Sequence, residues 1–143
     1  MEEALPGAGE RHVVGHSSTD ASEIYRIAYD PDRNLLTATC RGFWSPEDIG
    51  PYRVAMGRFV RIGHTKHGMI RCLVDRRKCP AQVGEVVDLI REAVVASVRD
   101  SDCFALVVTS TLVKMQARRA FELKRIKVFE ETEPAMAWLL GKD

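Results

Sequence analysis

The densest group of chemically capable side chains is the run Arg76, Arg77, Lys78 and Cys79. An arginine guanidinium can hold a carboxylate or a phosphate through two parallel hydrogen bonds, so two neighbouring arginines favour an anionic ligand. Cations and a following helix N-terminus lower the pKa of a thiol, which makes Cys79 a candidate reactive or redox-sensing cysteine. No histidine and no second cysteine accompanies Cys79 in this loop, so a passive loop cysteine is the alternative.

A second group of polar side chains follows a later apolar run. It consists of Ser110, Thr111, Lys114 and Arg118. Both groups come after predicted parallel strands, whose carboxyl ends meet at one edge of a sheet, where ligands commonly bind. Helix N-termini at this edge supply free backbone donors and a positive dipole end. The sequence therefore predicts a site for an anionic ligand or an acidic partner surface, with a solvated basic rim beside Asp75 and Glu85 as the alternative.

The other candidates for catalysis or metal binding lack the partners that such chemistry needs. His64 and His67 flank the predicted end of a helix, and nothing in the sequence positions a carboxylate or a pocket beside them. His12 and His16 have helical spacing, but the glycine between them and the following Ser-Ser-Thr run disfavour a helix. Ser110 stands outside a Gly-x-Ser-x-Gly motif, and no glycine-rich phosphate loop or regular Cys/His spacing is present. We therefore predict no metal, no cofactor and no enzymatic activity.

Hydrophobic periodicity predicts five strands and four helices along the chain. The predicted strands are Ile24–Asp30, Leu35–Arg41, Ile70–Asp75, Phe104–Thr109 and Lys127–Glu130. The predicted helices run from the N-cap Ser45 to Gly63, over Val83–Val98, over Leu112–Leu123, and from the cap Thr132 to Gly141. Strands separated by a helix pair in parallel through right-handed crossovers, whereas the first two form an antiparallel hairpin. The expected fold is α/β, with one mixed sheet of five strands.

Polar residues alternate with apolar ones along the first three predicted strands. They are Arg26, Thr37, Thr39, Arg41 and Arg71. A sheet covered by helices on both faces reads as nearly continuous apolar runs, so this alternation predicts four helices mainly on one face. The other face would then be open to solvent or to a second copy of the chain. Because the fourth strand is apolar on both sides, this open face would be partly apolar, which favours a protein partner or a homodimer.

Length and composition fit one soluble domain. The chain has 143 residues, of which 45% are hydrophobic, and a net charge of +1, so nothing demands nucleic acid as a partner. No apolar run approaches the roughly 18 residues of a membrane span, and the N-terminus shows no secretory pattern. We expect a cytoplasmic protein with reduced cysteines, a flexible N-terminal arm over residues 1–22, and one domain over residues 23–143.

Four segments resemble the SpoIIAA-like branch of the STAS domain superfamily. They are Tyr25-Arg26-Ile27-Ala28-Tyr29-Asp30, Gly42-Phe43-Trp44-Ser45-Pro46-Glu47-Asp48, Leu73-Val74-Asp75 and Met115-Gln116-Ala117-Arg118-Arg119. The resemblance covers Ile24 to Leu140 and implies a βα superhelix with helices stacked on one side of the sheet. This branch includes many bacterial proteins without an assigned activity. The resemblance therefore implies a bacterial binding or regulatory module that acts with a protein partner or as a homodimer. The Sec14-like proteins, distant relatives of this fold, carry lipids, so the resemblance also allows a lipid carrier.

The phosphorylation switch of the superfamily does not transfer to this chain. In family members a serine at the start of the helix after the central strand accepts the phosphate. The corresponding loop here, Asp75–Gln82, contains no serine or threonine. Two hypotheses stay open: a module that binds a protein or an anionic ligand, and a carrier or sensor of a small apolar or lipid ligand.

Overall fold

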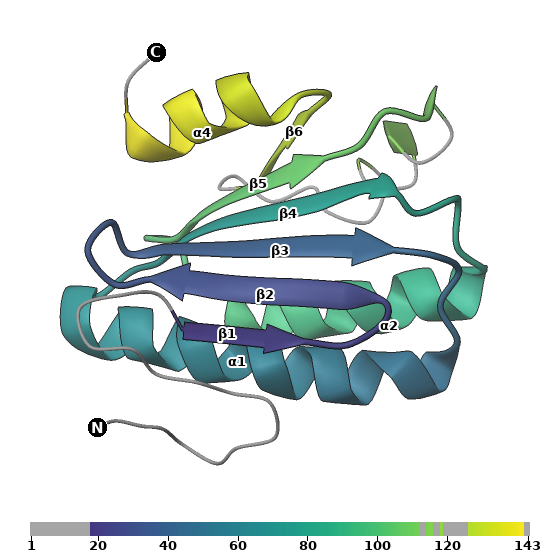
Figure 1. Ribbon diagram of the computed structural model, residues 1–143, viewed down its shortest axis with the longest axis horizontal. Helices are drawn as coiled ribbons and strands as arrows, with labels where there is room; N and C mark the ends of the chain where they lie inside the picture. The colour runs from purple at the N-terminus through teal and green to yellow at the C-terminus, as the bar shows by residue number, and fades with distance from the viewer. Residues whose placement is uncertain (1–17, 112–113, 116–117, 119–125, 142–143) are drawn as a thin grey trace.

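One mixed β-sheet forms the centre of the molecule (Figure 1). The computed structural model describes residues 18–111, 114–115, 118 and 126–141. Within them the strands are β1 Ser18–Ala21, β2 Tyr25–Asp30, β3 Leu35–Arg41, β4 Arg71–Lys78, β5 Cys103–Val107 and β6 Ile126–Phe129. They lie side by side in chain order; β1, β2 and β3 are antiparallel, and β3 to β6 are parallel. The predicted α/β class and mixed sheet are confirmed, but the sheet has six strands instead of five.

The additional strand is β1, which lies within the segment predicted to be a flexible arm. It pairs with β2 in the register Ser18 to Tyr29 and Ala21 to Arg26. Its sequence, Ser-Thr-Asp-Ala, has no apolar alternation, so backbone pairing with β2 holds it at the sheet edge. The buried Asp20 also forms an ion pair of 3.5 Å with Arg58 of the first helix. Residues 1–17 of the predicted arm lie outside the described residues.

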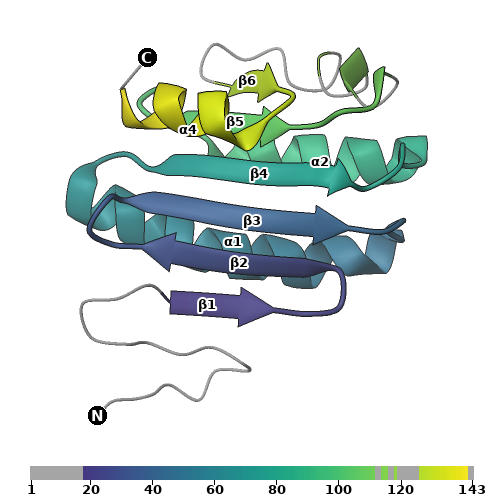
Figure 2. The same ribbon diagram turned by 45° about the horizontal axis from the view of Figure 1, so that its top comes forward.

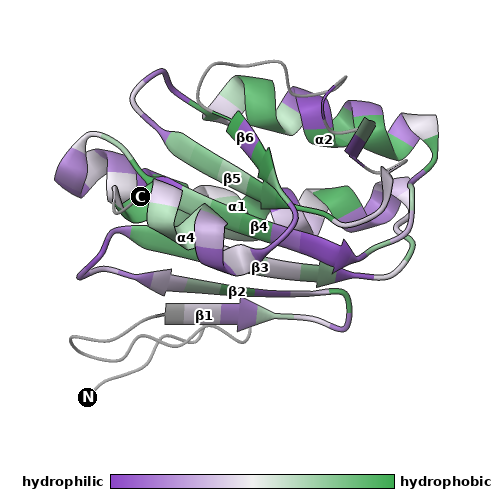
Figure 3. Ribbon diagram, turned by 90° about the horizontal axis from the view of Figure 1, so that it is seen from above, coloured by the Kyte–Doolittle hydropathy of each residue, from purple (hydrophilic) through white to green (hydrophobic). Residues whose placement is uncertain are grey.

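The helices cover both faces of the sheet unequally. Helices α1 (Pro46–His67) and α2 (Gly84–Ser97) lie side by side on one face, and α4 (Thr132–Leu140) lies on the other (Figures 1 and 3). The described part of the chain thus has three helices, with two on one face, and the predicted helix Leu112–Leu123 falls almost entirely outside it. None of the helices that the structure describes is long and apolar enough to cross a membrane.

Two hydrophobic cores follow from this arrangement. The larger core joins α1 and α2 to the sheet and includes Ile27, Leu36, Trp44 and Phe59. The smaller core joins α4 to the sheet through Leu35, Leu73, Ala105, Val107 and Leu139. Because α4 contacts mainly β4, β5 and β6, it leaves most of the same face of β1, β2 and β3 uncovered (Figure 2). Arg26, Thr39 and Arg41 are exposed there, as the alternation predicts. Thr37 and Arg71 are only partly exposed, and β4, the third strand predicted to be open on this face, lies under α4.

Helix α1 begins where the capping signals predict and ends later than expected. The Ser45 backbone N–H donates to Asp48 Oδ2 over 2.8 Å, as in a capping box. The helix continues through Gly63 to His67, and Gly68, with φ of 74°, closes it. Gly63 does not end the helix. A glycine there lets α1 approach Ile70 closely, because a Cβ at this position would lie 2.9 Å from Ile70 Cδ1.

Strand β4 is also longer than predicted. It includes Arg76, Arg77 and Lys78, which the sequence placed in a loop. The register between β3 and β4 shifts between Thr39 and Arg41, as in a β-bulge. This extension carries Arg76 beneath the helices of the larger core, which determines the composition of the candidate site.

Candidate functional site

A cavity of about 130 Å³ lies between the helix pair and the sheet. Helix α1 contributes Tyr52, Met56 and Val60 to its lining, among others. Helix α2 contributes Val87, Ile90, Val94 and Val98, and the strands contribute Cys72, Val74, Phe104 and Leu106. The exposed residues Arg53, Pro80 and Ser97 also lie on its boundary, so the cavity reaches the molecular surface. The site is therefore a mainly apolar pocket under two helices.

The cavity exists because the apolar stripe of α2 is incompletely packed. Valine and isoleucine recur at helical spacing along this helix, a pattern that favours a filled interface with the sheet. Of this stripe only Val86 is buried, whereas Val87, Ile90, Val94 and Val98 stay partly exposed. Protein interiors are packed about as densely as organic crystals, so these side chains lack contacts that a ligand could supply.

Arg76 lies at one end of the cavity and is only 8% exposed. Its guanidinium carbon lies 4.8 Å from the centre of the Trp44 ring, and its Nη1 atom lies 3.7 Å from Cys40 Sγ. Its Nη2 atom is buried and has no hydrogen-bond partner among the described residues. Of the three cations in the predicted basic loop, Arg76 alone lines the pocket, and it is buried. Cys79, Pro80 and Gln82 of the same loop also line the pocket.

The polar groups around Arg76 are neutral donors and thiols. Burial raises the pKa of Tyr52 well above its usual value, so its hydroxyl keeps its proton at neutral pH. Cys40 Sγ lies 3.8 Å from the Tyr52 hydroxyl, which brings Tyr52 and Arg76 to the same thiol. The Gln82 amide donates to Pro80 O over 2.7 Å and accepts from the Trp44 backbone over 2.8 Å. This end of the cavity is therefore polar but carries no described carboxylate.

Cys79 also lines the cavity, and its thiol is buried. It is 5% exposed, and burial raises the pKa of its thiol to about 11, despite the lowering effect of Arg76. Burial therefore outweighs the nearby cations, and of the two alternatives for Cys79 it supports the passive cysteine. The four cysteines form no disulfide, as expected.

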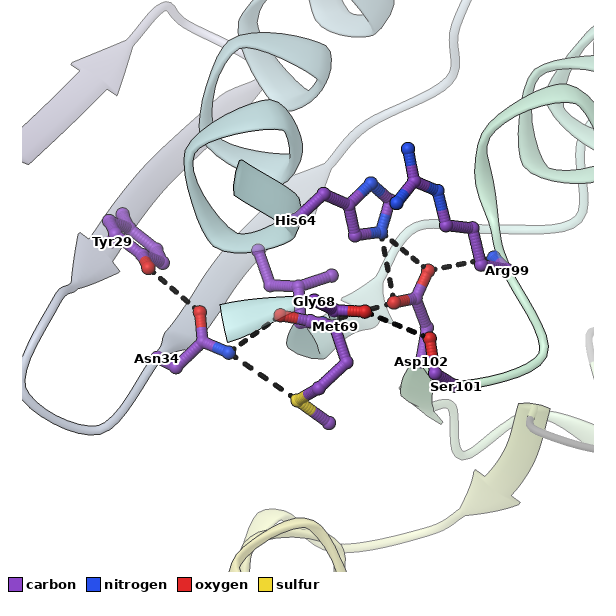
Figure 4. A network of polar contacts seen from close by, with 9 residues as sticks. Tyr29, Asn34, His64, Gly68, Met69, Arg99, Ser101 and Asp102 are labelled. Atoms are coloured by element: carbon purple, nitrogen blue, oxygen red, sulfur yellow. Dashed lines mark hydrogen bonds and ion pairs between the residues drawn. The ribbon is translucent and has the colours of Figure 1, made fainter. Parts of the chain in front are cut away.

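Asp102 lies at the other end of the cavity and binds three segments of the chain (Figure 4). Its carboxylate accepts from the backbone N–H of Ile70 over 3.0 Å and from that of Arg99 over 2.8 Å. His64 Nε2 lies 2.9 Å from Asp102 Oδ1, and both side chains are nearly inaccessible. The predicted helix ends at Gly63 and leaves His64 outside it, whereas α1 extends past His64 to His67 and positions it beside Asp102.

A second polar cluster beside this one joins the β2–β3 hairpin to the start of β4 (Figure 4). The Tyr29 hydroxyl donates to Asn34 Oδ1 over 2.7 Å, and Asn34 Nδ2 donates to Met69 O over 2.7 Å. Asn34 is buried with a positive φ of 51°, which asparagine tolerates better than most residues. Together the two clusters fix the end of the cavity that is remote from Arg76.

The remaining predicted site residues lie outside the cavity. Arg77 is exposed and forms two hydrogen bonds with Asp75, Nε to Oδ1 over 3.0 Å and Nη2 to Oδ2 over 2.8 Å. Lys114 pairs with Glu130, and its side-chain hydrogen bond lowers the pKa of that carboxyl. Lys78, Ser110, Thr111 and Arg118 are exposed, and the Lys114 backbone N–H donates to Ser110 O over 2.9 Å. Internal pairing therefore already satisfies two of the cations in the predicted anion site.

The described residues contain no cluster of three or more histidine, cysteine, aspartate or glutamate side chains that could hold a metal ion. Asp102 and His64 form a carboxylate–histidine pair, but backbone donors already occupy the same carboxylate. The arrangement is suited to enclosing an apolar molecule with one polar end.

Comparisons with known proteins add no relative. No family model matches the chain, and neither the curated proteins nor the solved structures include a match. The resemblance to the STAS superfamily therefore stays a prediction from the sequence.

Proposed function

We propose that this chain is a binding module that carries or senses a small, largely apolar ligand. The cavity between α1, α2 and the sheet is the observation that supports this proposal. Ligand sites in proteins are concave and mostly apolar, with a few polar groups that orient the ligand. Here the apolar walls run between Arg76 and Tyr52 at one end and Asp102 at the other.

The size of the cavity restricts the ligand. A cavity of roughly 150 Å³ in another protein takes up benzene or xenon, so about 130 Å³ suits a single ring or one slender chain. A phospholipid with two acyl chains is too large for this volume. The proposal therefore keeps the carrier or sensor role of the Sec14-like alternative but replaces a membrane lipid by a smaller molecule.

Anion binding at the strand ends receives less support. Arg77 and Lys114, two of the cations proposed for it, already pair with Asp75 and Glu130. An incoming anion would have to displace these carboxylates. The exposed ion pairs that it would form in their place contribute little binding free energy.

The test is the binding of toluene, a neutral apolar probe, to the purified full chain by saturation-transfer NMR. We expect a dissociation constant on the order of 1 mM for so small a ligand. Val94→Phe should abolish binding because Val94 lines the cavity and the larger ring fills it. Val95→Phe is the matched control, since the neighbouring Val95 is 58% exposed. Equal binding to both variants, or none to the natural chain, would contradict the proposal.

A further inference from the structure

The Arg76 side chain presents an unusual electrostatic situation. Its exposed fraction is only 8%, and it lines the cavity. Its contacts include the Trp44 ring and the thiols of Cys40 and Cys79, and its Nη2 atom has no described partner. No described carboxylate forms an ion pair with it.

A buried guanidinium without an anion is unfavourable. Arginine stays protonated in proteins, so Arg76 cannot relieve its burial by losing the proton. Charged groups in protein interiors are normally paired, and each buried donor without an acceptor needs a specific explanation. A cation–π contact with Trp44 offsets part of the desolvation penalty but provides no acceptor for Nη2. An anionic group entering the cavity would supply both the charge and the acceptor.

We propose that the ligand is an apolar monocarboxylic acid whose carboxylate binds the Arg76 guanidinium. This inference rests on the proposed binding function of the cavity. The Tyr52 hydroxyl, which shares the Cys40 thiol contact with Arg76, is placed to donate to the same carboxylate. Charge-assisted hydrogen bonds of this kind are short and about twice as strong as neutral ones.

The surroundings of Arg76 favour a carboxylate over a phosphate and a monoacid over a diacid. A phosphate dianion carries more charge than one guanidinium neutralises, and the neighbouring Arg77 is turned to Asp75. The far end of the cavity is formed by the Asp102 carboxylate, which would repel a second anionic group. The ligand therefore has its charge at one end only.

The shape of the cavity indicates the tail. Asp102 binds the backbone of Ile70, and Arg76 lies six residues further along the chain, a backbone span of roughly 20 Å in a strand. Because the cavity has a volume of only about 130 Å³ between such distant ends, it must be narrow. It fits one straight chain, and we expect alkanoic acids of about six to eight carbons to bind best.

The experiment compares octanoate with 1-octanol by isothermal titration calorimetry of the full chain at neutral pH. The two probes share the tail and differ in the head group. We expect octanoate to bind about tenfold to a hundredfold more tightly, which is the range for hydrogen bonds to a charged group. Octanol binding as tightly as octanoate would overturn the inference and leave the proposed binding function intact. If octanoate, octanol and toluene all fail to bind, the proposed function itself is wrong.

Two variants separate Arg76 from its neighbour. Arg76→Met keeps the apolar stem but removes the charge, so octanoate should lose its advantage over octanol. Arg77→Met should bind both probes as the natural chain does, because Arg77 is exposed and faces Asp75. Unchanged octanoate affinity in Arg76→Met would contradict the proposal. If that variant fails to fold, NMR of the ¹⁵N-labelled natural chain replaces it. The Arg76 Nε–H signal should shift when octanoate is added and stay unchanged with octanol. Equal shifts with both probes would overturn the inference.

Discussion

The buried Asp102 carboxylate offers the most quantitative test of the structure. Its Oδ1 atom accepts from the Ile70 backbone and its Oδ2 atom from the Arg99 backbone, while His64 Nε2 lies within 3.0 Å of both oxygens. Asp102→Asn replaces one acceptor oxygen by an amide donor, so one backbone N–H must lose its partner. The bond to His64 also loses its anionic acceptor.

The expected loss follows from these two contacts. Hydrogen bonds to charged groups contribute about 1.5–3 kcal/mol each, and a buried donor left alone carries a desolvation penalty. We therefore expect Asp102→Asn to lower the free energy of unfolding by about 3–5 kcal/mol. With a typical urea m-value of about 2 kcal/mol/M, the unfolding midpoint falls by roughly 2 M.

Urea unfolding followed by circular dichroism measures this loss. Asp100→Asn is the matched control, because Asp100 is exposed in the same turn and its replacement should change stability by less than about 0.5 kcal/mol. Midpoints that agree within about 0.5 M between the two variants would refute the assigned role of Asp102.

Two further predictions concern the order in which two cysteine thiols react and the effect of replacing two glycines of α1. Iodoacetamide at pH 8 should label the partly exposed Cys103 before Cys79, because burial raises the Cys79 pKa to about 11 and leaves little thiolate. Labelling of Cys79 should accelerate as the pH approaches that value. Peptide mass spectrometry measures this order, and rapid labelling of Cys79 would contradict it. Gly57→Ala should raise the melting temperature by about 3 °C, since a Cβ there meets nothing within 4 Å and alanine favours the helix. Gly63→Ala should lower it, because the same Cβ would lie 2.9 Å from Asn34 Oδ1; a rise in both variants would contradict the close approach.

Local signals in the sequence were sufficient for much of the fold. The β2–β3 hairpin and the start of α1 depend on a turn and a capping box that are encoded within a few residues. The alternation of Arg26, Thr39 and Arg41 correctly indicated an uncovered sheet face along β2 and β3. Strand β1 escaped prediction because it has no apolar pattern and is held by backbone pairing.

The candidate site depended on contacts that the sequence does not display. Three successive cations were interpreted as a loop, although the alternation of Cys72 and Val74 continues to Arg76 and places it on the apolar side. His64 continues the helical spacing from Val60, which was a signal for burial, but its partner Asp102 lies 38 residues away. The cavity itself could not be predicted, since the same apolar stripe on α2 also suits a filled interface.

Direct observation of a bound ligand between α1, α2 and the sheet would test the central claim most sharply. We predict intermolecular nuclear Overhauser effects between octanoate protons and the methyl groups of Val87, Ile90 and Leu106, which line the cavity. Leu35 and Leu139, in the core beneath α4, should show none. Contacts confined to the α4 side, or no contacts at saturating octanoate, would contradict the account.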